Sequence, residues 1–448
     1  MIGTLLRRAR GNAIVLAHLR GQRRAPYLPP EKLAARRDAR LRRLVAYAAG
    51  TVPYWSEFFR DRGIDPRDVR SVADLARLPL LDKAAVRADP SRLVSNSRTG
   101  RRSVAFLTSG TTASPLIVHH DESSLLANIA FGERERAVVA RACGREFGYR
   151  EAAITYGGAT LRRVWEFYRT HTFVPVRPTR LELSVEARLD VVVGALNDFR
   201  PDVLVGYGSY LETLFRVVAA RGLRLYRPRV VFYGADAMTE PGRRLIEDEF
   251  GAVVLAQYNA VEAFKIGFGC EAGQGYHLHE DLCWVSLVDG AGRPVPDGQP
   301  GEIVLTNLVN RGTVLLNYRL GDVGVRATSP CACGRTLPRL AELRGRVGEV
   351  LVLPGGRLVH PSAVWGVFRQ TSDVLRYQLV QEEPTRFLLR VLATDRAAYD
   401  DRIGGILERL RDLLGSVTVE PVFDPELEFA KAGKFRPVVS HCADQAVR

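Results

Sequence analysis

The chain has 448 residues, of which 46% are hydrophobic and 25% are charged, and its formal net charge is +14. This length exceeds what a single hydrophobic core usually serves, so a soluble globular protein of two or more domains is expected. The sequence contains no apolar run of about 18 residues, which argues against a transmembrane helix, and its six cysteines are too sparse for a disulfide scaffold. We therefore expect a cytoplasmic protein.

The basic charge comes almost entirely from arginine. Lysine occurs only at positions 32, 83, 265, 431 and 434, so each lysine is a candidate for a specific role. No zinc-finger spacing, RNA-binding motif or recognition helix accompanies the arginines, and nucleic acid is not expected as a partner. Phosphorylated small molecules are the better match for this charge.

The first 24 residues are basic and partly apolar. His18 and several arginines interrupt the apolar run and no small-residue cleavage site follows, so a signal peptide is not expected. The stretch could lie on a membrane surface as an amphipathic helix, but a helix packed on the adjoining domain is the preferred interpretation. Residues 30–95 then have the pattern of helices separated by short polar breaks.

Between residues 150 and 260 short apolar strands alternate with amphipathic helices. Strands are predicted at 202–207, 229–234 and 253–258, with one helix closed by Gly222 and another that begins after Thr239 and ends at Gly251. This order predicts a parallel sheet with right-handed crossovers. Ligands of such sheets bind beyond the carboxyl ends of the strands.

The C-terminal part changes pattern again. Residues 285–327 are predicted to form short β segments around a turn-rich stretch, and the order after residue 349 is strand, strand, helix, strand, strand, helix, strand. We predict an α/β protein with a large N-terminal domain over residues 1–345, which contains parallel sheets and a small β region. A small, mobile C-terminal α+β domain is predicted over residues 346–448.

Five short motifs occur in order along the chain: "LTSGTT" at 107–112, "YNAVE" at 258–262, "YRLGD" at 318–322, "RGR" at 344–346 and "AGKFR" at 432–436. Together they resemble the core motifs of adenylate-forming enzymes, the superfamily of acyl-CoA synthetases, adenylation domains and luciferases. "LRRLVAYAAGTVPYWSEFF" and "GYHLHED" are similar to signatures of the phenylacetate–CoA ligase branch and its capsule-biosynthesis relatives. The resemblance covers nearly the whole chain.

The resemblance implies a site for ATP and AMP. Hydroxyls and pliable backbone at 108–112 suit phosphates, Glu262 resembles the magnesium ligand, and Asp322 resembles the carboxylate that accepts both ribose hydroxyls. Lys434, with Lys431 as a competitor, resembles the cation that stabilises charge during adenylation. The candidate catalytic residues are thus Lys434, Glu262 and Thr108. The nucleotide-binding candidates are Thr108, Ser109, Gly110, Thr111, Thr112, Gly234, Ala235, Asp236, Tyr258, Asn259, Asp322 and Arg346.

Two positions depart from the family pattern. Leu116 stands where relatives have the lysine of the phosphate loop, and Gly348 stands where they usually have the aspartate or lysine of the domain hinge. These departures favour an alternative, a nucleotide-binding regulator without turnover. The retained Glu262, Asp322 and Lys434 argue against it.

A second constellation predicts a structural zinc site. Cys270, His277, Cys331 and Cys333 offer three thiolates and one imidazole, which suit tetrahedral Zn²⁺ with no open position. His279 could replace His277. The alternative is a set of buried free cysteines beside an ordinary histidine.

The resemblance also implies an activity. A carboxylic acid, aryl or otherwise apolar, is activated with ATP and Mg²⁺ to an acyl-adenylate, and the acyl group passes to coenzyme A. Amide formation with an amine, loading of a carrier protein, and transfer of AMP to the acceptor are the alternatives. The acid pocket is expected to include Tyr156, Gly157, Gly158, Tyr207 and Gly208, because aromatic residues suit such an acid. Relatives are often dimers, so a homodimer is expected.

Overall fold

A computed structural model of the chain describes residues 2–97, 103–108, 116–156, 160–173, 179–344, 351–359, 361–368, 371, 373–393, 395–425, 427 and 437–442. Among these residues no helix is both long enough and apolar enough to cross a membrane.

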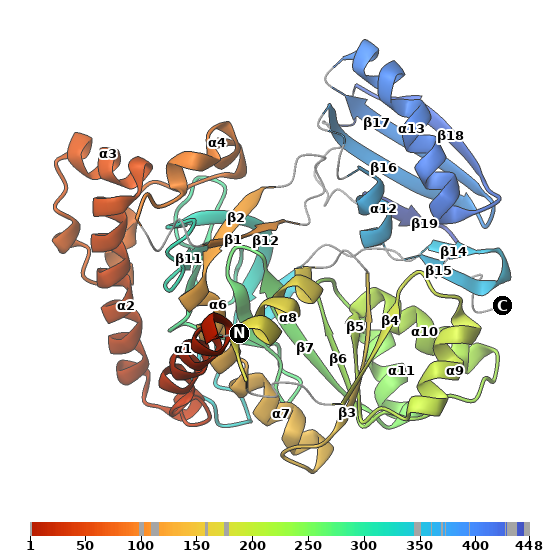
Figure 1. Ribbon diagram of the computed structural model, residues 1–448, viewed down its shortest axis with the longest axis horizontal. Coiled ribbons are helices and arrows are strands. Elements are labelled where there is room, and N and C mark those ends of the chain that lie inside the picture. Colours follow the sequence, from red (N-terminus) through yellow and green to blue (C-terminus); the bar gives the residue numbers. More distant parts are fainter. Residues whose placement is uncertain are drawn as a thin grey trace.

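Helices dominate residues 2–97 and gather on one side of the molecule (Figure 1). Apolar residues at helical spacing, such as Leu41, Leu44, Val45 and Ala48, form the buried face of the helix over Pro30–Thr51. The predicted helices are therefore confirmed here. Their bounds are α1 Ile2–Leu19, α2 Pro30–Thr51, α3 Pro53–Arg62 and α4 Lys83–Ala88, with 3₁₀ turns at Ala25–Tyr27, Pro66–Asp68, Val72–Arg77 and Pro90–Leu93.

One 11-stranded sheet forms the centre of the protein, in the order β10-β11-β12-β13-β9-β8-β7-β6-β5-β3-β4. Strands β4, β3, β5, β6 and β7 are parallel, whereas β8 to β13 are joined to β7 and to one another by antiparallel pairing. The predicted parallel sheet and small β region are thus two halves of one sheet. The strands are β3 Arg150–Thr155, β4 Thr179–Ser184, β5 Val203–Tyr207, β6 Val230–Gly234, β7 Val253–Ala260, β8 Phe264–Phe268, β9 Tyr276–Leu278, β10 Cys283–Val288, β11 Pro300–Asn307, β12 Tyr318–Arg326 and β13 Arg339–Arg344.

Helices cover both faces of the parallel half (Figure 1). Alternate residues of each strand enter opposite cores: Leu204 packs with α9, α10 and α11, whereas Val203 and Val205 pack with α7. Both faces of these strands are therefore apolar, as expected of parallel sheets. The helices are α6 Glu122–Phe131, α7 Glu133–Cys143, α8 Thr160–His171, α9 Leu189–Phe199, α10 Gly208–Ala220 and α11 Glu240–Phe250.

The predicted strand–helix–strand–helix–strand unit is confirmed as β5, α10, β6, α11 and β7. The Thr239 side chain accepts a hydrogen bond from the Gly242 N–H at 3.1 Å and so begins α11. Gly251, with φ of 70°, ends it in the left-handed conformation that glycine favours. The caps read from the sequence therefore fix both ends of this helix.

The C-terminal residues form a unit with its own core, drawn in blue in Figure 1. Its strand and helix order matches the prediction, with one further strand at the end. The proposed boundary at residue 345 and the hinge at Gly348 lie outside the described residues, so both stay predictions. The elements are β14 Leu351–Leu353, a 3₁₀ turn at Pro354–Gly356, β15 Arg357–Val359, α12 Pro361–Phe368, β16 Val374–Glu383, β17 Arg386–Ala393, α13 Arg396–Leu414, β18 Thr418–Phe423 and β19 Val438–Ser440.

Candidate functional site

The carboxyl ends of four neighbouring strands carry most of the described candidate residues. Tyr156 follows β3, Tyr207 ends β5, Gly234 ends β6 and Tyr258 lies near the end of β7. These strands are parallel neighbours, so their carboxyl ends lie along one edge of the sheet. The structure therefore gathers these residues where ligands of such sheets bind.

Asp322 reaches this edge from the other half of the sheet. The Tyr258 hydroxyl donates a hydrogen bond to Asp322 Oδ2 at 2.9 Å. Strand β12, which carries Asp322, lies four strands from β7 in the sheet order, or roughly 19 Å along a flat sheet. The antiparallel half must therefore curl back on itself. Helices α2 and α3 fill the curl, where the fully buried Trp55 donates to the Val314 carbonyl at 3.1 Å.

Glu262 lies in the turn between β7 and β8, and donors hold this turn at two consecutive carbonyls. The His120 ring contacts the Val261 carbonyl oxygen through Nε2 at 2.6 Å, and the Asn307 amide donates to the Glu262 carbonyl at 2.9 Å. Burial lowers the pKa of His120 to about 4, so the ring is neutral near pH 7. Because Nε2 faces an acceptor, we assign the ring proton to this nitrogen.

The Glu262 side chain is 4% exposed. Burial raises the pKa of its carboxyl group, the positive charge of Lys83 counteracts this rise, and the negative charge of Asp322 adds to it. Two carboxylates thus share a site with one ammonium group. A divalent cation is the natural complement of such a donor set.

Lys83 is placed by local structure at the start of α4. The Asp82 side chain caps this helix by accepting from the Ala85 N–H at 2.7 Å. Just before the cap, the Leu81 N–H donates to the Asn317 carbonyl and the Leu81 carbonyl accepts from the Arg319 N–H, which ties this segment to β12. Lys83 Nζ therefore lies next to Gly321, at 3.7 Å from where a Cβ would stand.

Two non-glycine residues beside the site have positive φ. Ala235, directly after β6, has φ of 70°, and Phe264, at the start of β8, has φ of 60°. Phe264 is held by edge-on contact with the Phe106 ring and by the His120 ring, whose centroid is 4.4 Å away. Such backbone strain persists only where packing enforces it and is concentrated at functional sites.

Thr108 pairs with Leu116, and these two residues flank the segment that is expected to hold phosphates. Its N–H donates to the Leu116 carbonyl at 2.9 Å and its hydroxyl oxygen accepts from the Leu116 N–H at 3.0 Å. This loop joins strands β1 Ser103–Leu107 and β2 Ile117–Asp121, which pair antiparallel. Several predicted site residues lie outside the described residues: Ser109, Gly110, Thr111, Thr112, Gly157, Gly158, Arg346 and Lys434.

The remaining nucleotide candidates lie along the same edge. A Cβ at Gly234 would lie 2.6 Å from the Gln257 side chain, so a larger residue here would force that side chain to move. The Asp236 carboxylate accepts hydrogen bonds from the backbone and hydroxyl of Ser209. In the amide orientation that satisfies its hydrogen bonds, the Asn259 side chain donates to the Phe264 carbonyl at 2.9 Å and so supports the Glu262 turn.

The described residues of the predicted acid pocket serve packing as well. Gly208 begins α10 so close to the Ala237 backbone that a Cβ would lie 2.8 Å from it. Tyr156 packs against both the core of the parallel half and the core of the C-terminal unit. Its hydroxyl leaves no room for a Cβ at Gly366 in α12. Tyr156 thus contacts both parts of the chain at the strand ends.

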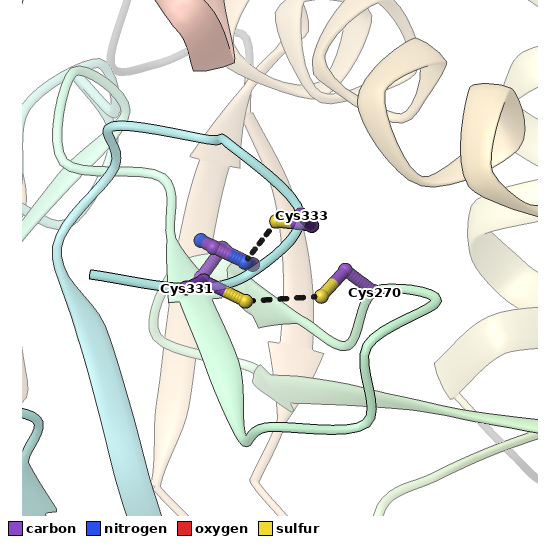
Figure 2. Close-up of side chains that lie close together, drawn as sticks. Cys270, Cys331 and Cys333 are labelled. Atoms are coloured by element: carbon purple, nitrogen blue, oxygen red, sulfur yellow. Dashed lines mark hydrogen bonds between the residues drawn. The ribbon is translucent and has the colours of Figure 1, made fainter. Parts of the chain in front are cut away.

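The predicted zinc ligands come together at the other end of this part of the sheet. One ligand atom from each of Cys270, His277, Cys331 and Cys333 lies within 4.8 Å of all the others. Figure 2 shows the three cysteine sulfur atoms converging, with Cys270 and Cys331 Sγ 3.6 Å apart, and Cys333 Sγ is 3.3 Å from His277 Nε2. Sulfur ligands of one tetrahedral Zn²⁺ are about 3.8 Å apart, so the donor set fits this metal.

The cluster joins two connections of the antiparallel half. Cys270 follows β8, His277 lies in β9, and both other cysteines lie between β12 and β13. Gly275, with φ of 85°, lies so close to the Leu340 carbonyl of β13 that no Cβ would fit. His279 lies elsewhere: its Nε2 is 3.1 Å from the Glu135 carboxylate, which also accepts from Lys265 at 2.6 Å.

Sequence reasoning missed Lys83, His120 and Asn307 as partners of the Glu262 turn. A signal existed for Lys83, because lysine is rare in this chain and this one follows a helix-capping aspartate. For His120 the only signal was a histidine pair on a strand, where one of the two side chains must point inward. His119 points away from the turn and contacts Ser103 Oγ at 3.2 Å. Nothing in the sequence distinguishes Asn307.

Known proteins that resemble this chain were found by sequence and by structure, although no family model matches it. A phenylacetate–coenzyme A ligase of Thermus thermophilus is 30% identical over 365 residues, which cover 79% of this chain and 79% of that protein. A phenylacetate–coenzyme A ligase of Aromatoleum evansii is 27% identical over 343 residues, with 73% of each chain covered.

Solved structures of 2-hydroxyisobutyryl-CoA ligase share the fold. One, in complex with 2-HIB-AMP and CoA, has a TM-score of 0.61 at 21% identity and covers 92% of this chain and 91% of its own. Another, with R3-HIB-AMP in the postadenylation state, has a TM-score of 0.57 at 20% identity, with 94% and 93% covered. The predicted fold class and resemblance are thereby confirmed. The chain belongs to the phenylacetate–CoA ligase family of adenylate-forming enzymes.

Proposed function

We propose that this protein activates a carboxylic acid with ATP and transfers the acyl group to coenzyme A. The observation that carries the proposal is the meeting of Glu262, Asp322, Tyr258 and Lys83 at the strand ends of a fold shared with adenylate-forming CoA ligases. Curated relatives that match most of the chain are named phenylacetate–coenzyme A ligase. An aryl or otherwise apolar acid is therefore the proposed substrate.

In the first half-reaction an oxygen of the acid attacks the α-phosphorus of ATP. The bond from this phosphorus to the β-bridging oxygen breaks and pyrophosphate leaves. Attack of one anion on another requires neutralised phosphates and held reactants. Magnesium bound by Glu262 would supply that neutralisation, and Asp322 would accept the ribose hydroxyls in place of the Tyr258 hydroxyl.

Lys83 is proposed to replace the cation that the phosphate loop lacks. The loop has Leu116 where relatives carry a lysine, whereas the Lys83 ammonium group lies beside Gly321 and its charge acts on the Glu262 carboxylate. Lys434 is proposed to stabilise the charge that develops on the α-phosphate, with Arg346 near the nucleotide. In the second half-reaction the coenzyme A sulfur attacks the acyl carbon and AMP leaves. The small domain, over 346–448, is proposed to rotate between the two steps.

The zinc cluster is proposed to be structural. Four protein ligands leave no open position for a substrate. Bound zinc would fix the β8–β9 and β12–β13 connections to one another, and these strands support the Glu262 turn and Asp322.

The first prediction concerns adenylation. Wild-type protein with phenylacetate should exchange labelled pyrophosphate into ATP when magnesium is present. Glu262→Gln and Lys83→Met should each lower the exchange rate about 100-fold, because each removes charge that the transition state needs. Lys32→Met, at an exposed lysine of α2, is the matched control and should leave it unchanged. No exchange by wild type with any of a panel of aryl and aliphatic acids would refute the function.

The second prediction concerns the hydrogen bond between His120 and the Val261 carbonyl, which holds the Glu262 turn. His120→Asn places its amide short of the Val261 carbonyl, whereas His120→Gln can reach it. His120→Asn should lower kcat/KM roughly 10- to 100-fold and raise the magnesium concentration needed for half-maximal activity, and His120→Gln should restore most of both. If both variants lose thermal stability but keep the wild-type magnesium dependence, His120 only packs the core and does not position Glu262.

The third prediction concerns the metal. Elemental analysis should find about one zinc per chain. Cys331→Ser should release the metal and lower the unfolding midpoint, because metal binding to a folded site adds to folding free energy. Cys143→Ser, at a buried cysteine outside the cluster, and His279→Gln should both retain zinc. Wild-type protein that contains no metal and is as stable as after addition of zinc would contradict the site.

A further inference from the structure

Helix α1 is apolar on two opposite sides. Its inner side packs on α6 and α8, with Gly11 and Val15 buried (Figure 1). Its outer side carries Leu5, Leu6 and Leu16, which are 54%, 65% and 58% exposed. Leu5 and Leu16 are separated by about three helical turns, so they lie on the same side. The exposed alanines at 9, 13 and 17 complete this side.

This outer side, which we name the α1 outer face, is not what a solvent-facing helix surface needs. A helix on the surface of a soluble domain normally has one apolar stripe, and that stripe faces the core. In α1 the inner side already supplies the apolar stripe that faces the core. The outer side forms a second apolar stripe, and none of the described residues covers it. An exposed apolar strip of this kind, which no described residue covers, is typical of a surface that contacts a partner.

The residues around the α1 outer face are strongly basic. The first 30 residues contain six arginines and no aspartate or glutamate. Arg7, Arg10, Arg20 and Arg24 are exposed, and none forms an ion pair with any described residue. Arg10 flanks the leucines, and Arg20 lies in the turn that follows the helix. Exposed leucines flanked by arginines are complemented by a surface that is negatively charged outside and apolar beneath.

We infer that the α1 outer face docks on the surface of an anionic lipid bilayer, with the helix lying in the plane of the interface. Leucines enter the boundary between headgroups and acyl chains, and the flanking arginines meet lipid phosphates. Binding of this kind is peripheral and reversible. No candidate site residue lies on α1, so substitutions on this helix do not change the residues of the proposed ligase site. The inference does not depend on the proposed function.

The experiment is flotation of the full chain with vesicles of phosphatidylcholine alone or mixed with phosphatidylglycerol. We expect the bound fraction on the anionic vesicles to exceed that on neutral vesicles at least about tenfold at low salt and to fall at high salt. Two triple variants test the two parts of the α1 outer face, and each should lower anionic binding about tenfold or more. They are Leu5→Ser with Leu6→Ser and Leu16→Ser, and Arg7→Gln with Arg10→Gln and Arg20→Gln.

Matched triple variants use exposed residues elsewhere and should bind like wild type. They are Val191→Ser with Leu223→Ser and Val253→Ser, and Arg224→Gln with Arg409→Gln and Arg411→Gln. Pyrophosphate exchange should be unchanged in all four. If the leucine variant does not fold, the arginine variant still decides. Equal binding of wild type to both vesicle types would overturn the inference. No binding, together with a concentration-dependent dimer that the leucine variant abolishes, would also overturn it. This second result would assign the α1 outer face to a second copy of the chain.

Discussion

The turn between β7 and β8 is the constraint on which the site depends. It presents a carboxylate that is almost fully buried, and burial raises the pKa of this group above its value in the unfolded chain. A raised carboxyl pKa means that ionisation costs folding free energy as pH rises through and above the unfolded pKa. The protein nevertheless keeps this carboxyl group buried, in a turn whose backbone carbonyls are hydrogen-bonded by His120 and Asn307. A buried carboxyl group that lowers the stability of the fold is expected at functional positions, where a local requirement for activity outweighs stability.

The continuous sheet explains how distant motifs meet. Tyr258 belongs to the parallel half and Asp322 to the antiparallel half, yet their side chains share a hydrogen bond because the sheet curls around α2 and α3. The same curl carries β12 past the start of α4 and so places Lys83. The cysteine–histidine cluster then joins the outer connections of the same strands. The same sheet thus supports both the candidate nucleotide site and the cysteine–histidine cluster.

Local signals in the sequence predicted the parallel half well. Thr239 and Gly251 end their helix where capping chemistry requires, and alternating apolar strands mark β5, β6 and β7. The cysteine spacing and the choice of His277 over His279 also agree with the geometry of the cluster. These features depend on residues near one another in the chain or on the rarity of cysteine. The contacts of Lys83, His120 and Asn307 could not be predicted, because they depend on how far the sheet curls, and no local periodicity encodes that.

The central claim is that a single adenylate occupies the edge between Tyr258, Glu262 and Asp322. The most direct measurement is a crystal structure of the protein with a non-hydrolysable phenylacetyl-adenylate analogue and Mg²⁺. We expect both ribose hydroxyls to donate to the Asp322 carboxylate, with the acyl group toward Tyr207. Electron density for the analogue at any other surface, with the Tyr258–Asp322 hydrogen bond undisturbed, would contradict it.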